Sequence, residues 1–160
     1  MKNKLVTLAV ALLAATGASA QFERGKAYVA ASLSGVGVKY NGADKGSLGF
    51  LAKGGYLFAD DMMVTAQLGY DKQNGVPASY SLGAGFRYYI VQNGLYLGAS
   101  ASYKRSTKDF DDFMPSVQAG YAFFLSQTVT VEPEVYYEQS FKNHSDYSTI
   151  GFRIGVGVYL

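Results

Sequence analysis

Apolar and polar residues alternate with a period of two along most of this chain, most clearly in its last stretch. From Ile150 to Leu160 the sequence reads IGFRIGVGVYL, in which every second residue from Ile150 is apolar and the residues between are mostly glycine. Strict alternation predicts a β-strand whose two faces meet different surroundings. The face between the apolar residues carries one charge, Arg153.

Seven earlier stretches alternate in the same way, so the sequence predicts an all-β chain with eight strands. In the first of them the apolar phase changes around Ser34 and Gly35, which predicts a β-bulge. The lengths suit tilted strands that cross a bilayer, which need about 9 to 11 residues. The seven stretches are residues 26–40, 47–58, 62–70, 80–90, 95–103, 114–125 and 129–138.

The connections between these stretches alternate between short and long. Short turns are predicted at 59–61, 91–94 and 126–128, and longer polar loops at 41–46, 71–79, 104–113 and 139–147. Short turns on one side and longer loops on the other are typical of an antiparallel up-and-down barrel in the outer membrane. An even number of strands places both ends of the barrel domain on the periplasmic side.

The first twenty residues have the features of a cleaved signal peptide. Lys2 and Lys4 precede an apolar run at 5–15, and Ala18-Ser19-Ala20 fits the small-residue cleavage rule. The apolar run is shorter than the roughly 20 residues that a helix needs to cross a membrane. We therefore expect a signal peptide at 1–20 and a single barrel domain at 21–160.

Composition narrows the class of protein further. Removing Lys2 and Lys4 from the 14 basic residues leaves 12, which balance the 12 acidic ones, so a nucleic-acid partner is not expected. The absence of cysteine excludes disulfides and thiolate metal sites. Nineteen glycines and fourteen tyrosines without any tryptophan are unusual for a soluble enzyme and favour an outer-membrane barrel.

A soluble barrel also alternates, but with its apolar face inward. Here the polar phase consists mainly of glycine and serine, which suit a crowded lumen better than a water-exposed face. Aromatic residues also collect at strand ends, where membrane barrels carry their girdles. The predicted girdle residues are Tyr40, Tyr70, Tyr80, Tyr103 and Tyr137 on the extracellular side, and Phe58, Tyr88 and Phe123 on the periplasmic side.

The signal peptide, the eight alternating stretches and the aromatic, glycine-rich last strand resemble the small outer-membrane β-barrel proteins such as OmpX, OmpW and the membrane domain of OmpA. The resemblance covers residues 21–160 and rests on the pattern, not on a specific motif. It implies a porin-like transmembrane barrel in the outer membrane of a Gram-negative bacterium. Leu160 departs from the phenylalanine that usually ends the last strand. No peptidoglycan-binding domain follows the strand, so a peptidoglycan tether is not implied.

Charged residues in the inward phase form the candidate site. A charge in a narrow lumen is costly unless it is paired, so we expect a network of ion pairs with Gln67 and Gln118 as hydrogen-bonding partners. The hairpin formed by the last two strands places Arg153 opposite one of two glutamates. The network is interpreted either as a plug that holds the barrel shut or as a gate that opens when pairs exchange. Its residues are Lys53, Arg87, Glu132, Glu134 and Arg153.

Two other groups of residues invite a chemical interpretation. His144, Ser145 and Asp146 suggest a lipid-modifying enzyme, but consecutive side chains diverge and do not form a catalytic relay. Asp109, Asp111 and Asp112 offer oxygen ligands for Ca²⁺, but they lack the glycine and final glutamate of an EF-hand loop. We therefore expect no catalytic site, bound metal or cofactor.

The favoured function is non-enzymatic: a monomer in outer-membrane lipid that serves envelope structure or binds a surface ligand through the loops at 104–113 and 139–147. One alternative is a narrow pore for small or apolar solutes. A lipid-modifying enzyme is a third, weaker hypothesis.

Overall fold

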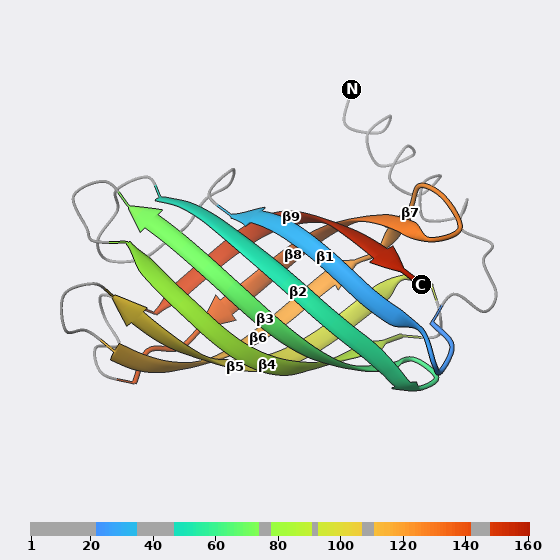
Figure 1. Cartoon of the computed structure of the whole chain (residues 1–160), viewed down its shortest axis with the longest axis horizontal. Helices are drawn as coiled ribbons and strands as arrows, with labels where there is room; N and C mark the ends of the chain where they lie inside the picture. The colour runs from blue at the N-terminus through green and yellow to red at the C-terminus, as the bar shows by residue number, and fades with distance from the viewer. Residues whose placement is uncertain (1–21, 35–46, 74–77, 91–92, 107–110, 142–147) are drawn as a thin grey trace, which may run out of the picture.

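The chain forms a closed antiparallel β-barrel (Figure 1). The computed structural model describes residues 22–34, 47–73, 78–90, 93–106, 111–141 and 148–160. The strands are β1 (Ala27–Ser34), β2 (Ser47–Ala59), β3 (Met62–Gln73), β4 (Ser79–Tyr89), β5 (Leu95–Ser106), β6 (Asp111–Tyr121), β7 (Phe123–Phe124), β8 (Val129–Glu138) and β9 (Thr149–Tyr159). Among the described residues no helix is long and apolar enough to cross a membrane.

Neighbouring strands pair in sequence order around the barrel, and β1 also pairs with β9. The two-residue strand β7 continues β6 and pairs with the same partner, β8, so the barrel wall has eight strands. The predicted eight-stranded antiparallel barrel is therefore confirmed, including the closure of the last strand on the first. We call the end where β1 begins and β9 finishes the turn end, and the opposite end the loop end (Figure 1).

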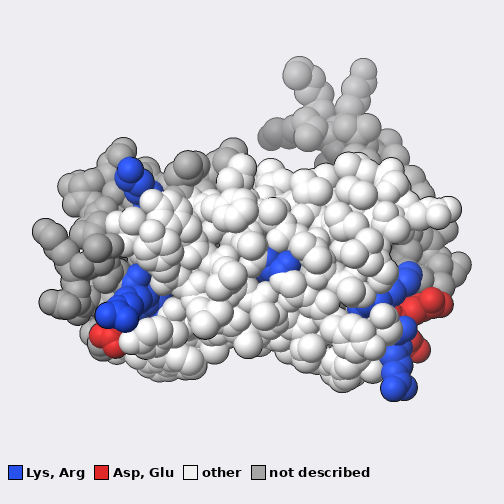
Figure 2. Space-filling view, in the orientation of Figure 1, with Lys and Arg blue, Asp and Glu red and all other residues white. Residues whose placement is uncertain are grey.

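The apolar phase of every strand faces outward, which is the reverse of a soluble barrel. On the outer face, Leu68 of β3 and Leu82 of β4 are 61% and 63% exposed. On the inner face of β9, Gly151, Arg153 and Gly155 are buried. Figure 2 shows charged side chains at the two ends of the barrel, with one small basic area in an otherwise uncharged middle. A broad uncharged apolar band around a barrel is the surface that lipid covers.

Aromatic side chains lie on the outer surface toward both ends of the wall. The rings of Tyr70 and Tyr80 are 5.2 Å apart near the loop end, and those of Phe58 and Phe86 are 6.1 Å apart near the turn end. Of the other predicted girdle residues, Tyr103, Tyr137 and Tyr88 are exposed and Phe123 is half-buried, while Tyr40 lies outside the described residues.

The strands at the loop end are longer than the sequence predicts. β3 continues to Gln73, β5 continues to Ser106 and β6 begins at Asp111, so the loops expected at 71–79 and 104–113 are shorter than expected. Polar residues extend these strands because they pair across the wall. Lys104 forms an ion pair with Asp71 at 3.3 Å, and the Tyr103 hydroxyl donates to Asp111 at 2.7 Å.

The sixth strand and the first differ in how they compare with the sequence predictions. The sixth stretch was predicted to be continuous, but it is interrupted at Ala122, whose N–H donates to the carbonyl of Gly94 at 2.8 Å instead of extending the strand ladder. The β-bulge predicted around Ser34 and Gly35 cannot be compared, since residues 35–46 lie outside the described ranges.

The turn between β2 and β3 holds an aspartate that has a left-handed backbone and an unpaired carboxylate oxygen. Asp61 has φ +62°, and one of its carboxylate oxygens is buried without a hydrogen-bond partner in the described structure. Its backbone accepts a hydrogen bond from the N–H of Tyr89 at 2.8 Å, which keeps the residue at the barrel mouth. Burial, followed by the negative charge of Asp60, raises the pKa of the Asp61 carboxyl group.

Replacing this carboxylate by an amide is expected to stabilise the barrel at neutral pH. A carboxyl group with a raised folded-state pKa favours folding while it is protonated, and this contribution is lost as pH rises through that pKa. Asp61→Asn keeps a side chain that tolerates positive φ and removes the charge. We expect a gain of about 0.5 kcal/mol at pH 7.

Urea unfolding of the refolded protein in lipid vesicles at pH 7 and at pH 3 measures this effect. Because the wild-type carboxyl group is protonated at pH 3, the stability advantage of Asp61→Asn should disappear there. An equal advantage at both pH values would show that the charge is not its source.

Candidate functional site: a charged cluster in the lumen

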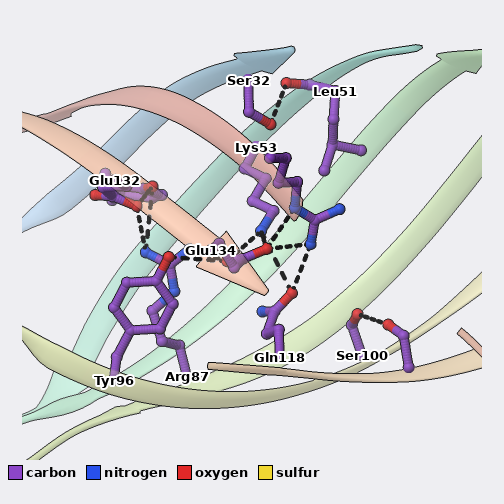
Figure 3. Close-up of polar contacts among 12 residues, drawn as sticks. Ser32, Leu51, Lys53, Arg87, Tyr96, Ser100, Gln118, Glu132 and Glu134 are labelled. Carbon is purple, nitrogen blue, oxygen red and sulfur yellow. Dashed lines mark hydrogen bonds and ion pairs between the residues drawn. The ribbon is translucent and has the colours of Figure 1, made fainter. Parts of the chain in front are cut away.

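Five charged side chains meet in the middle of the barrel lumen (Figure 3). The period-two alternation directs each of them inward from its strand, and every one is at most 8% exposed. We call this group the lumen cluster. Its members are Lys53 on β2, Arg87 on β4, Glu132 and Glu134 on β8, and Arg153 on β9.

Glu134 is the centre of the lumen cluster. Its carboxylate accepts hydrogen bonds from Lys53 Nζ at 3.2 Å and from Arg87 at 3.4 Å. Arg153, which lies directly opposite in the β8–β9 ladder, forms the third ion pair through two nitrogens. Glu134 therefore compensates the charge of three buried cations at once. Gln118 supports the same cations, because its Oε1 accepts from Arg153 at 2.9 Å and from Lys53 at 3.5 Å.

Glu132 forms a second centre, closer to the turn end. Arg87 donates to it at 2.9 Å, and the Tyr28 hydroxyl donates to the same oxygen at 2.6 Å. Its other oxygen accepts from Thr130 Oγ1 at 2.9 Å and from the Tyr159 hydroxyl at 3.1 Å. Every oxygen of this carboxylate therefore has a donor, as a buried charge requires.

Arg87 is held by aromatic rings as well as by carboxylates. Its guanidinium carbon lies 3.9 Å from the ring centroid of Tyr96 and 5.1 Å from that of Tyr28, within the range of cation–π attraction. The Tyr89 and Tyr159 hydroxyls are 2.7 Å apart, and Tyr89 accepts from Arg87 at 3.2 Å. The Nε atom of Arg87 is buried without a hydrogen-bond partner in the described structure.

The structure brings all five candidate residues together and selects one of two expected pairings. Arg153 faces Glu134 and not Glu132. Gln118 joins the cluster as expected, whereas Gln67 is buried nearby with its carbonyl oxygen unpaired among the described residues. Tyr159 stands in the inward phase of the last predicted strand, but the other inward tyrosines were not predicted. Their signal was present, because they share the strand phase of the glycines and the buried charges: Tyr28, Tyr89, Tyr96 and Tyr136.

The space left inside the lumen cluster is very small. A cavity of about 10 Å³ is lined by the five charged side chains together with Tyr28, Ser32 and Tyr96. That volume accommodates about one water molecule.

The other candidate residues do not assemble into a reactive site within the described structure. Asp112 accepts a hydrogen bond from Ser140 and Asp111 accepts one from Tyr103, while Asp109 lies outside the described residues. His144, Ser145 and Asp146 also lie outside them. In the described ranges no three histidine, aspartate or glutamate side chains lie close enough to hold a metal ion.

Comparison with known proteins supports the fold. No family model matches the sequence, and no curated protein matches it. Neisserial surface protein A superposes with a TM-score of 0.63 at 18% identity, covering 83% of this chain and 95% of its own. The N-terminal β-barrel domain of Pseudomonas aeruginosa OprF superposes with a TM-score of 0.63 at 15% identity, covering 86% and 98%.

A third solved structure agrees with these two. The outer membrane protein OprG from Pseudomonas aeruginosa superposes with a TM-score of 0.58 at 14% identity, covering 89% of this chain and 99% of its own. At such low identity the likeness establishes the architecture alone. The fold of this chain is that of the small eight-stranded outer-membrane β-barrel proteins.

Proposed function

We propose that this chain is a non-enzymatic protein of the Gram-negative outer membrane whose barrel is closed at mid-height. The lumen cluster is the observation that carries the proposal. The Arg87–Glu132 pair joins β4 to β8, three strands away around the wall, and the Lys53–Glu134 pair joins β2 to β8 from the other direction. Ion pairs from both sides of the lumen thus converge on β8.

The energetics of the cluster favour a plug over a gate. Removing one partner from a buried ion pair costs about 3–5 kcal/mol, because the remaining charge is left without compensation. Glu134 is shared by three cations, so withdrawing any one cation leaves two others in place. A gate would have to separate several of these contacts together.

The proposed role outside the lumen is envelope structure or binding of a surface ligand at the loop end. Phe113 and Phe141 support this, since their rings are stacked with centroids 6.4 Å apart and are 52% and 69% exposed. They lie beside the connections at 107–110 and 142–147, whose own residues are outside the described ranges. An exposed aromatic pair at this end of the barrel offers a contact surface for either role.

Conductance across a planar lipid bilayer tests the closed lumen. The refolded wild-type protein is expected to show no unitary openings, and Arg153→Ala is expected to remain closed because Lys53 and Arg87 still compensate Glu134. A large porin inserted into the same bilayer serves as the positive control.

Two results would contradict this proposal, and they differ. Steady unitary openings of the wild-type protein would favour the narrow-pore alternative. Openings that occur only in Arg153→Ala would show that the lumen cluster is a gate.

A further inference from the structure

We propose that residues 22–26 form a second seal across the turn end of the barrel, built from aromatic contacts and separate from the lumen cluster. The inference deepens the proposed closed barrel and rests on it. We call the seal the aromatic cap, which consists of Phe22 with Tyr89, Phe124 and Tyr159.

The Phe22 ring is packed inside the barrel mouth. It is 0% exposed and stacks on Tyr89 with centroids 3.8 Å apart and an interplanar angle of 13°. Its edge contacts are with Tyr159 at 5.5 Å and Phe124 at 5.6 Å. These are favourable aromatic geometries in addition to the apolar area that they bury.

The contacts of Phe22 span the whole width of the mouth. In the eight-stranded wall β4 and β9 are four strands apart in either direction, so Tyr89 and Tyr159 start from opposite sides. Their hydroxyls nevertheless meet at 2.7 Å, which leaves the mouth bridged. Phe22 covers this bridge and connects it to Phe124 on β7. A passage through the turn end would have to displace this ring.

Backbone hydrogen bonds hold the segment in place. The carbonyl of Phe22 accepts from the N–H of Asp61 at 2.9 Å, and the N–H of Arg24 donates to the Asp60 carboxylate at 2.9 Å. Gly25 then donates to the carbonyl of Leu57 at 2.7 Å. Gly25 has φ +98°, a conformation that glycine adopts without strain and that turns the chain from the mouth into β1. These three hydrogen bonds therefore attach the segment to the end of β2 and to the β2–β3 turn.

The aromatic cap and the lumen cluster are consecutive layers. The Phe22 ring contacts Tyr89 and Tyr159, and the hydroxyls of these two tyrosines form hydrogen bonds with Arg87 and Glu132. Thr130 lies at the boundary, fully buried and bonded to Glu132. Loss of the Phe22 ring should therefore open a path as far as Thr130 while leaving the charged layer intact.

Thiol labelling tests this directly, because the chain contains no cysteine. Thr130→Cys introduces one thiol of nearly the same size as threonine beneath the cap. Its reaction with a small charged methanethiosulfonate reagent is measured in refolded protein, with and without Phe22→Ala. We expect labelling at least about tenfold faster without the ring, which corresponds to about 1.4 kcal/mol in opening equilibrium.

The matched control is Glu23→Ala, which changes the adjacent exposed residue and should leave the labelling rate unchanged. Phe22→Leu provides a second variant in case Phe22→Ala does not refold, and an intermediate rate is expected for it. Heat-dependent gel migration verifies that each variant is folded.

The outcomes separate this inference from the closed barrel itself. If folded Phe22→Ala and Phe22→Leu label no faster than their parent, the aromatic cap is not a seal, whereas the lumen cluster can still keep the wild-type protein non-conducting. If Phe22→Ala labels faster and also conducts in the bilayer while the wild-type protein does not, the aromatic cap is a seal and closure of the lumen by the charged cluster is wrong.

Discussion

Glu134→Gln is expected to destabilise the folded barrel by about 3–5 kcal/mol, as is usual when a buried ion pair loses one partner. Glutamine has the same shape and keeps one oxygen acceptor, so the substitution removes little except the charge. Arg87 retains Glu132, but Lys53 and Arg153 lose the carboxylate that compensates them. Both cations are buried, so water compensates them poorly.

The measurement is urea unfolding in lipid vesicles, followed by far-ultraviolet circular dichroism and by heat-dependent gel migration. Glu138→Gln is the matched control, since Glu138 lies on the same strand and is only partly buried. The control is expected to change the free energy of unfolding by less than about 1 kcal/mol. Equal effects of the two substitutions would show that Glu134 is not the compensating charge described above.

Gly85→Val is expected to have the second large effect, because the lumen has no space for a side chain at this position. A Cβ atom on Gly85 would lie 2.6 Å from the Cβ of Ser100, 2.9 Å from the carbonyl oxygen of Ala99 and 3.1 Å from Thr65 Oγ1. The second of these is a backbone atom, which a side-chain rotation does not move. Overpacking of this kind costs about 1–3 kcal/mol, and sometimes more.

The adjacent residue provides a matched control for Gly85→Val. Ala84 lies on the same strand and faces outward, so Ala84→Val introduces the same side chain into lipid instead of the lumen. We expect the control to refold with wild-type yield and Gly85→Val to refold with lower yield and a lower urea midpoint. Similar results for both would indicate that the wall expands easily and that the lumen is not close-packed.

The architecture was largely predictable because it follows from local alternation. Strands such as β9 carry their orientation in the sequence itself: Ile150, Phe152 and Ile154 face lipid, and Gly151 and Arg153 face the lumen. Strand ends were less predictable. Asp71 and Lys104 are charged, which suggests a loop, but they extend β3 and β5 because they pair with each other over the intervening strand β4.

The residues of the candidate site were predictable from the sequence, whereas the ion pairs and hydrogen bonds among them were not. Inward phase identified the charged residues, but the choice between Glu132 and Glu134 as the partner of Arg153 depends on the offset of one hairpin. The position of Arg87 among tyrosine rings depends on strands far apart in the sequence. Phe22 was missed because it lies outside any alternating stretch, and its environment exists only once the barrel has closed.

The lumen cluster also has a consequence for how the wall aligns during assembly. In β8, Glu132 and Glu134 alternate with Pro133 and Val135, so sliding the strand by one residue would turn both carboxylates toward lipid and bring two apolar residues inside. Charged side chains on the lipid face are costly near the bilayer midplane. The same displacement would separate Glu134 from cations on three other strands. The buried ion pairs therefore disfavour sheets in which β8 is misaligned by one residue. A barrel with only apolar and small residues in alternation would tolerate such a misalignment more readily.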